Sequence, residues 1–204
     1  MLERLISALI TGSIRLLTGA QARWIGCAPT TAQRVYFANH SSHVDFVLLW
    51  SVLPPALRRR TRPVAAKDYW ARGAMRRFLI HRVFRGLVIE RTGFHRDDNP
   101  LAIMLAALDS GDSLILFPEG TRGRGGDIQP FKAGLFHLAE ACPDVELIPA
   151  FIDNAYRVMP KGAALPVPLL CSVAFGKPVR PGDGESKPEF LERSRHALLE
   201  LETA

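Results

Sequence analysis

Asn39-His40-Ser41-Ser42-His43-Val44-Asp45 is the stretch that decides the fold of this chain. It follows an apolar run at residues 35–38, which is typical of a buried strand, and it precedes a second run at 46–50, which is typical of a buried helix. We therefore expect a strand-to-helix turn at the edge of a sheet, where α/β proteins bind ligands. A cluster of polar side chains between two apolar runs is costly to desolvate, which indicates a chemical role.

The rest of the chain alternates between strand-like and helix-like patterns. Asn99-Pro100, for example, places an N-cap residue before a proline, as at the start of a helix. The 204 residues suit one domain, and the alternation predicts an α/β fold with a central mixed, largely parallel sheet flanked by helices. Strands are predicted near 35–38, 64–66, 86–89, 114–117, 146–152 and 171–175, and helices near 2–20, 46–53, 73–83, 101–108, 131–141 and 188–202.

Composition narrows the class of protein. Hydrophobic residues make up 48% and charged residues 23%, a balance that argues against disorder. The three cysteines are far apart and show no metal-binding spacing, so we expect reduced thiols in a cytoplasmic setting. The pattern predicts neither a secretory signal nor a transmembrane helix.

Positive charge is concentrated in one segment. Between Arg58 and Arg96, eleven arginines and Lys67 face only Asp68 and Glu90, a net charge of +10 in a chain whose total is +6. Such a surplus indicates an anionic partner such as lipid headgroups, a phosphorylated small molecule, an acidic protein or nucleic acid, although a solvated basic face is the plainer alternative.

The N-terminal helix is amphipathic. Its apolar stripe comprises Leu2, Leu5, Ile6, Leu9, Leu16, Leu17 and Ala20, and Arg4, Arg15 and Arg23 lie off it. The stripe can pack on the protein's own core or lie in a membrane interface, and both interpretations stay open. Ile10 and Ile14 fall outside the stripe, which favours the membrane.

Polar residues at the ends of four predicted strands can form one site, because the ends of parallel strands meet at one sheet edge. These residues are His40 with Asp45, Lys67, Arg91, and the loop 119–122.

Within that site, Asp45 can return to one imidazole nitrogen of His40 and leave the other as a general base. Ser41 or Ser42 as a nucleophile is less attractive, since no nucleophile elbow is present. His40, His43 and Asp45 lack a matching second ligand cluster, so we expect no metal. Asn39 and Ser42 are expected to shape the turn.

The loop Glu119-Gly120-Thr121-Arg122 offers a hydroxyl, a guanidinium and a close backbone approach. Together with Arg91, Lys67 and Lys132 it can hold a phosphate through charge-assisted bonds. Glu119 is expected to orient Arg122 or a substrate hydroxyl.

Four blocks resemble, in order and spacing, the motifs of the glycerolipid acyltransferases, in particular the branch with 1-acylglycerol-3-phosphate acyltransferases. The first and third are specific, the second and fourth are loose, and the resemblance covers about residues 33–180. The blocks are Asn39-His40-x-Ser42-x-x-Asp45, residues 86–91, Phe117-Pro118-Glu119-Gly120-Thr121-Arg122, and Ile148-Pro149-Ala150.

The resemblance implies a mechanism. His40, oriented by Asp45, removes the proton from the hydroxyl of a lysophospholipid, whose oxygen attacks the thioester of acyl-CoA or acyl-carrier protein. No cofactor is implied, because the acyl donor is a substrate. The third block and Arg91 would hold the acceptor's phosphate, and the Pro149 block would line the thioester or acyl site.

The most favoured product is phosphatidate, made from 1-acylglycerol 3-phosphate. Glycerol 3-phosphate or a lyso-aminolipid is an alternative acceptor, and a non-catalytic basic module that binds membranes or nucleic acid is the alternative of another class. Few aromatic residues lie among the arginines, so we expect no nucleic acid. We expect an N-terminal helix at 1–24, an acyltransferase domain at 25–204, and peripheral or monotopic attachment to an anionic membrane at its cytoplasmic face.

Overall fold

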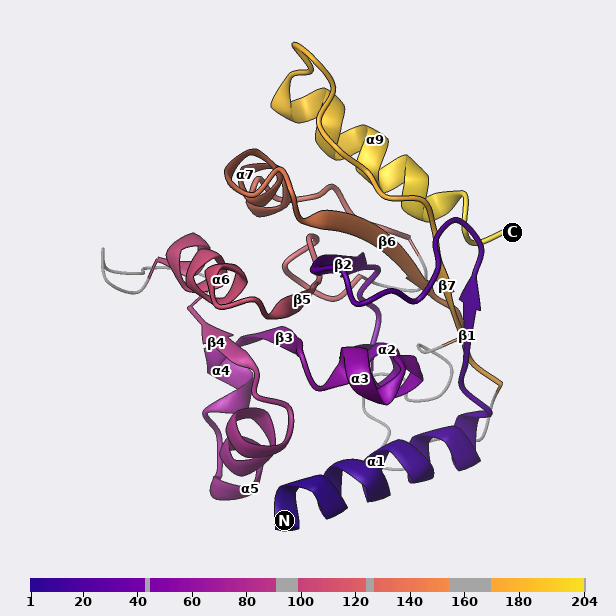
Figure 1. Cartoon of the computed structure of the whole chain (residues 1–204), viewed down its shortest axis with the longest axis vertical. Helices are drawn as coiled ribbons and strands as arrows, with labels where there is room; N and C mark the ends of the chain where they lie inside the picture. Colours follow the sequence, from indigo (N-terminus) through magenta and orange to yellow (C-terminus); the bar gives the residue numbers. More distant parts are fainter. Residues whose placement is uncertain (43–44, 91–98, 124–126, 155–169, 204) are drawn as a thin grey trace.

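The computed structural model describes residues 1–42, 45–90, 99–123, 127–154 and 170–203, and its strands form one sheet (Figure 1). The strand order is β1-β7-β6-β2-β5-β3-β4, and every pairing is parallel except that of β6 with β7. The predicted mixed, largely parallel sheet is confirmed. The strands are β1 (Gln21–Trp24), β2 (Arg34–Ala38), β3 (Thr61–Ala66), β4 (Leu87–Ile89), β5 (Ser113–Leu116), β6 (Glu146–Ile152) and β7 (Ser172–Phe175).

Helices cover both faces of the sheet (Figure 1). One face packs against α1 (Leu2–Thr18), α2 (Asp45–Val52), α3 (Pro55–Arg58) and η1 (Leu79–Val83), and the other against α6 (Pro100–Asp109), α7 (Gly134–Ala141) and α9 (Lys187–Leu199). The short helices α4 (Lys67–Trp70) and α5 (Ala74–Phe78) follow β3.

Strand β2 shows why its sequence is a continuous apolar run. Val35 and Phe37 belong to one core cluster, whereas Tyr36 and Ala38 belong to the cluster on the opposite face, and all four are at most 1% exposed. A parallel strand with helices on both faces buries every side chain. The carboxyl end of β2 is thereby fixed in the middle of the sheet, between β5 and β6.

The predicted elements lie close to their expected positions. Asn99 caps α6, because its side chain accepts a hydrogen bond from the Leu101 amide at 3.0 Å. The predicted helix at 73–83 is α5 continued by the π-helical turn η1. Strand β1 and the single-turn helices α3 and α4 were not predicted, since four residues are too few to show a period. Because β1 pairs with β7, the sheet includes residues 21–24, which the sequence pattern groups with the N-terminal helix.

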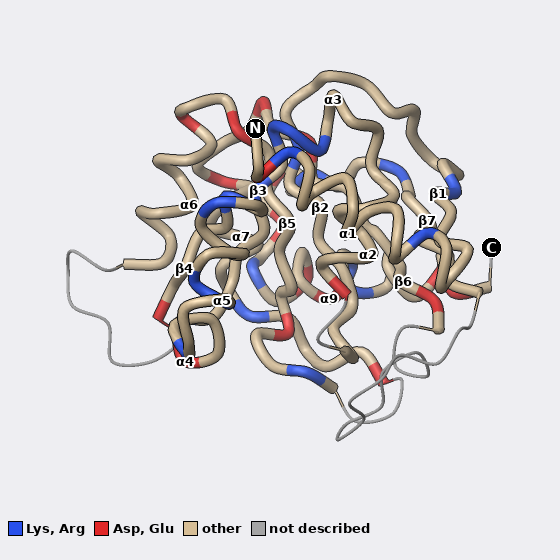
Figure 2. Tube along the Cα trace, turned by 90° about the horizontal axis from the view of Figure 1, so that it is seen from below, with Lys and Arg blue, Asp and Glu red and all other residues tan. Residues whose placement is uncertain are grey.

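The basic segment does not form one surface. Arg58 and Arg59 precede β3, and Arg82 and Arg85 precede β4, so these four lie at the amino-terminal ends of the strands. Lys67 and Arg72 follow β3 and lie at the opposite edge. Viewed from below, the Lys and Arg positions are correspondingly dispersed, with one group beside the N-terminus (Figure 2).

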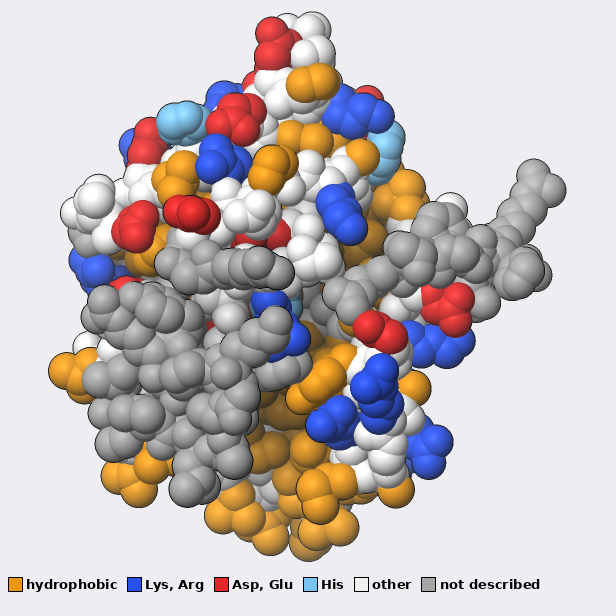
Figure 3. All heavy atoms as spheres, turned by 180° about the vertical axis from the view of Figure 1, so that it is seen from behind, with side chains coloured by type: hydrophobic (Ala, Val, Ile, Leu, Met, Phe, Trp, Pro, Cys, Tyr) orange, Lys and Arg blue, Asp and Glu red, His pale blue; other side chains and the backbone are white. Residues whose placement is uncertain are grey.

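Helix α1 carries two apolar faces rather than one. Ile6, Ile10 and Ile14 pack against the core, whereas Leu2, Leu5, Leu9 and Leu16 are between 58% and 86% exposed. The predicted single stripe was therefore wrong in grouping Ile6 with the leucines and in leaving Ile10 and Ile14 outside the packed face. Hydrophobic side chains gather along the lower edge of the molecule, where α1 lies (Figure 3). No described helix is long and apolar enough to cross a membrane.

Candidate active site

The turn between β2 and α2 is organised by the carboxylate of Asp45. Its Oδ2 atom accepts hydrogen bonds from His40 Nδ1 at 2.8 Å and from the backbone amides of Ser41 at 2.6 Å and Ser42 at 2.7 Å. Asp45 is fully buried, and its Oδ1 atom has no hydrogen-bond partner among the described residues. One carboxylate oxygen thus fixes both the backbone of the turn and the orientation of the imidazole.

His40 is the part of this turn that reaches solvent. Its side chain is 24% exposed, and its Nδ1 atom is occupied by Asp45, so Nε2 is the nitrogen that can exchange a proton with a ligand. The ring stacks on Phe117 with centroids 4.4 Å apart and planes inclined by 26°. Phe117 could not be singled out from the sequence as a site residue, because a phenylalanine that ends a strand is most often a core residue.

Asn39 ties the end of β2 to the end of β6. Its side-chain amide donates to the carbonyl of Ile152 at 3.0 Å and accepts from the Ile152 amide at 2.8 Å. Ser42 is buried within the turn. These contacts are of the kind expected for turn-shaping residues, and His43 lies outside the described residues.

Glu119 joins the third motif block to the first. The residue is 3% exposed, and its two oxygens accept hydrogen bonds from the backbone amides of His40 at 2.7 Å and Gln129 at 2.9 Å. Burial raises the pKa of Glu119, and the amides of Gln129 and His40 partly offset this rise. The Glu119 carboxylate therefore binds two backbone amides, and among the described residues it makes no hydrogen bond to Arg122. Its predicted contact with substrate stays a prediction.

The remainder of the third block brings cations towards His40. Gly120 has φ +70°, and a β-carbon there would lie 2.8 Å from Lys132 Nζ, so the lysine crosses directly over the glycine. Thr121 and Arg122 are exposed.

His40 lies where two cavities meet. A polar cavity of about 220 Å³ is lined by Arg122, Arg72 and Asp68 together with His40 and Phe117. An apolar cavity of about 390 Å³ extends from His40 between β3, β4, β5, α6 and α7, with Lys132 and Glu90 among its lining residues. The same imidazole can thus meet a polar group on one side and an apolar chain on the other.

The other predicted site residues are more dispersed. Lys67 lies beyond the end of β3, and its Nζ atom is 2.6 Å from Glu90 Oε1. Arg91 lies outside the described residues. Pro149 is buried in β6 and lines neither of these two cavities, so its assignment to an acyl site stays a prediction. No group of three or more His, Cys, Asp or Glu side chains is arranged to hold a metal within the described ranges.

Several known proteins resemble this chain. The 1-acyl-sn-glycerol-3-phosphate acyltransferase of Cocos nucifera is 26% identical over 84% of this chain and 56% of its own length, and that of Limnanthes douglasii is 28% identical over 89% and 63%. The human 1-acyl-sn-glycerol-3-phosphate acyltransferase alpha is 28% identical over 84% and 59%. This chain therefore spans rather more than half the length of these relatives.

The fold has a solved counterpart. The crystal structure of the 1-acyl-sn-glycerophosphate (LPA) acyltransferase PlsC from Thermotoga maritima matches 98% of this chain and 78% of that one, with a TM-score of 0.75 and 21% identity. Residues 27–153 match the Acyltransferase family. This range contains the turn between β2 and α2, Glu119 with its two amide partners, and the residues of β3 to β5 that line the cavities beside His40. The chain belongs to the Acyltransferase family.

Proposed function

We propose that this protein transfers a fatty acyl chain from an acyl thioester to the free hydroxyl of 1-acylglycerol 3-phosphate, giving phosphatidate and a free thiol. The observation that carries the proposal is the 2.8 Å contact between His40 Nδ1 and Asp45 Oδ2 at the junction of a polar and an apolar cavity. The names of the relatives support this choice of acceptor.

The chemistry follows from the orientation of the imidazole. His40 Nε2 takes the hydroxyl proton while the hydroxyl oxygen bonds to the thioester carbonyl carbon. Asp45 stabilises the resulting imidazolium through Nδ1. The carbon–sulfur bond then breaks, and the proton passes from Nε2 to the departing thiolate. No acyl group becomes attached to the protein.

The acceptor's phosphate is assigned to the cations beside His40. Lys132 crosses over Gly120, and Arg122 lines the polar cavity. Charge-assisted hydrogen bonds from the Lys132 ammonium and the Arg122 guanidinium would hold the phosphate. The acceptor's hydroxyl would remain free to reach Nε2 of His40. Thr121, Lys67 and Arg91 are assigned to the same phosphate from their positions in the sequence.

The acyl chain is assigned to the apolar cavity of about 390 Å³. Most of its wall is formed by apolar side chains of the sheet and of α6 and α7, which can accept a hydrocarbon chain. The wall includes Val64, Ile89, Met104, Leu116 and Leu135.

Attachment to a membrane is proposed for the exposed face of α1. Leu2, Leu5, Leu9 and Leu16 are exposed although each is strongly apolar, which is unusual for a soluble surface. A helix of this kind lies in the bilayer interface with its apolar side buried among acyl chains. Such peripheral attachment, which we assign to a cytoplasmic membrane face, would bring the site to its lipid acceptor.

The test is a release assay for free thiol with a panel of substrates. Acyl-CoA and acyl-carrier protein serve as donors, and 1-acylglycerol 3-phosphate, glycerol 3-phosphate and a lyso-aminolipid serve as acceptors. We expect release that depends on 1-acylglycerol 3-phosphate with at least one donor. Release with only another acceptor would reassign the substrate, and no release with any combination would favour a non-catalytic binding module.

A further inference from the structure

A cavity of about 570 Å³ lies at the edge of the sheet opposite to that of His40. It is bounded by the first two turns of α1, by the end of α2, by α3, and by the residues that lead into β3 and β4. These are the amino-terminal ends of the parallel strands, whereas His40 follows a carboxyl-terminal end. The cavity is therefore separate from the proposed active site, and its volume is in the range of small-ligand sites.

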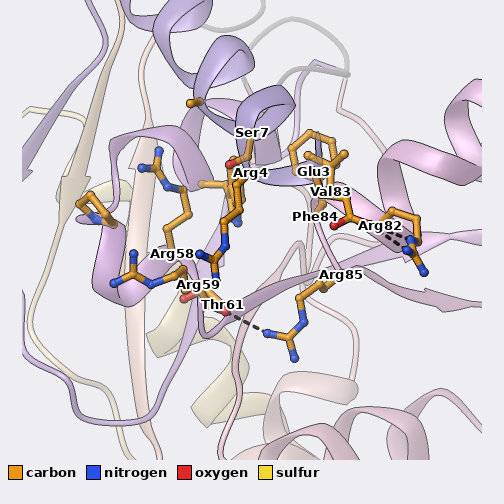
Figure 4. A pocket seen from close by; sticks show the side chains of 13 residues that line it. Glu3, Arg4, Ser7, Arg58, Arg59, Thr61, Arg82, Val83, Phe84 and Arg85 are labelled. Atoms are coloured by element: carbon orange, nitrogen blue, oxygen red, sulfur yellow. Dashed lines mark hydrogen bonds and ion pairs between the residues drawn. The ribbon is translucent and has the colours of Figure 1, made fainter. Parts of the chain in front are cut away.

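Its lining is strongly basic. Arginines approach it from three parts of the chain, and Glu3 is the only carboxylate among its described lining residues (Figure 4). The five arginines are Arg4 on α1, Arg58 and Arg59 beside α3, and Arg82 and Arg85 before β4.

Two of these guanidinium groups are paired with acids. Arg82 lies 2.8 Å from Glu3, and Arg85 donates to the carbonyl of Arg59 at 2.9 Å (Figure 4). Arg85 also lies 3.4 Å from Asp112. These contacts order two walls of the cavity without neutralising the remaining three arginines.

Arg4, Arg58 and Arg59 have no carboxylate partner in the described part of the chain. Arg58 is half-buried and donates only to Thr11 and to the carbonyl of Ser51, with its guanidinium 5.2 Å from the centre of the Trp50 ring. Burial lowers the pKa of Arg58, and the charges of Arg15 and Arg59 lower it further. Uncompensated positive charge is thus concentrated here.

The Trp50 indole lies under the Arg58 guanidinium in the same wall. Trp50 lines the cavity and is 4% exposed, and its indole nitrogen has no hydrogen-bond partner among the described residues. A buried indole N–H without an acceptor is uncommon. Because that nitrogen is itself buried, the arginines are the charged donors that line the cavity, and an anion with several oxygens is the ligand type that they can bind together.

The position of α1 indicates where this anion comes from. Arg4 and Arg15 lie eleven residues apart, or about three turns, so they share one side of the helix. Leu5 and Leu16 have the same spacing and form part of the exposed leucine face next to them. When the leucines enter a bilayer, Arg4 is at the depth of the phosphates, whereas Arg15 donates to the carbonyl of Ser51 at 2.9 Å.

We propose that this cavity binds the phosphate of an anionic phospholipid headgroup from the bilayer in which α1 lies. Arg4 and Arg59 hold the phosphate oxygens, and the site is non-catalytic. The assignment rests on the proposed membrane attachment of α1 and is independent of the acyl transfer.

The test is cosedimentation of the purified protein with vesicles of phosphatidylcholine alone or mixed with phosphatidylglycerol. Arg4→Gln/Arg59→Gln is the test variant, because both side chains are exposed and neither is hydrogen-bonded or ion-paired to another element in the described part of the chain. Each lost arginine is expected to weaken binding to the mixed vesicles about fivefold. Thiol release measured with substrates in detergent stays at the wild-type rate.

Two comparisons distinguish lipid binding in this cavity from non-specific attraction to positive surface charge. Arg180→Gln removes an exposed arginine on the segment between β7 and α9 and is expected to change binding less than twofold. Arg4→Lys/Arg59→Lys keeps the charge but loses the two-pronged geometry, and several-fold weaker binding is expected. Equal losses in the Arg180 and Arg4/Arg59 glutamine variants, or wild-type binding by the lysine variant, would overturn the proposal.

Two more outcomes overturn it in distinguishable ways. If inorganic phosphate raises the melting temperature as much as phosphatidylglycerol micelles do, the ligand is a free phosphate rather than a lipid. If the wild-type protein binds neither kind of vesicle, the attachment of α1 fails and the lipid assignment fails with it, while thiol release still tests the acyltransferase proposal separately.

Discussion

At the scale of single residues, the Oδ2 atom of Asp45 has two tasks. It holds the amides of Ser41 and Ser42, and it holds His40 Nδ1. Asp45→Asn keeps an oxygen for the amides but removes the negative charge that stabilises the imidazolium. We expect kcat to fall by about 10²–10⁴-fold, with little change in KM.

Steady-state kinetics of acyl transfer measure this effect, and circular dichroism verifies that the variant is folded. Asp183→Asn, which changes an exposed aspartate before α9, is the matched control and is expected to keep the wild-type kcat. A kcat within twofold of wild type for Asp45→Asn would contradict the orienting role.

The charged side chain of Glu119 stabilises the backbone of two loops through hydrogen bonds. Its two oxygens each accept one amide hydrogen bond, from His40 and from Gln129. A glutamine has only one acceptor oxygen, so Glu119→Gln leaves one partly buried amide without its acceptor. We expect a loss of about 1–3 kcal/mol in the free energy of unfolding, measured by urea denaturation. Glu200→Gln, at an exposed position, is the control, and equal stability of the two variants would contradict this stabilisation.

At the scale of elements, α1 provides a test with adjacent residues. Leu9 is 61% exposed, whereas Ile10 packs against the core. Ile10→Ala is expected to lower the free energy of unfolding by about 1–3 kcal/mol, because the position is partly buried, and Leu9→Ala is expected to change it by less than about 0.5 kcal/mol.

Membrane affinity should respond in the opposite order. Each leucine that enters the bilayer contributes about 1.5–3 kcal/mol, so Leu5→Ala/Leu9→Ala is expected to weaken vesicle binding by at least tenfold. Cosedimentation measures this change. Unchanged vesicle binding together with a loss of stability would show that the leucines pack within the protein.

The start of α9 provides a test by pH. Two hydrogen bonds of 2.7 Å from Arg193, with one from the Gly182 amide, lower the pKa of Glu185 from 4.5 to about 2. Because the folded pKa is the lower one, the stabilisation is complete above pH 4.5 and is lost as the pH falls towards 2.

The matched variant is Arg193→Gln, which removes the main cause of the shift. The difference in free energy of unfolding between wild type and variant is expected to shrink between pH 4.5 and pH 2. Urea denaturation across this range measures the difference, and one that stays constant or grows would refute the assignment.

Local patterns predicted the long elements because these elements bury regular faces. The sequence predicted the strands β2, β5 and β6 from their apolar runs, and the start of α6 from its N-cap. The role of Ile10 and Ile14 was not, since α1 has apolar residues on two sides and only packing distinguishes them. Strand β1 was not predicted because residues 21–24 are held in the sheet by their pairing with β7, which is distant in the sequence.

At the scale of the whole molecule, the sheet separates what the sequence groups together. The basic segment between Arg58 and Arg96 is continuous in the sequence. In the structure, Arg58, Arg59, Arg82 and Arg85 line the cavity beside α1, whereas Lys67 and Arg72 lie at the opposite edge of the sheet. Conversely, His40 is distant in the sequence from Phe117 and Arg122, yet all three line one cavity. Parallel topology, which local composition does not encode, decides both outcomes.

One pair of variants tests whether His40 is the general base. Thiol release from the acyl donor in the presence of 1-acylglycerol 3-phosphate is measured for His40→Ala and for His196→Ala, an exposed histidine on α9. We expect His40→Ala to fold normally and to lose at least about 10²-fold in rate, whereas His196→Ala keeps the wild-type rate. Wild-type release by a folded His40→Ala protein would contradict the general-base role.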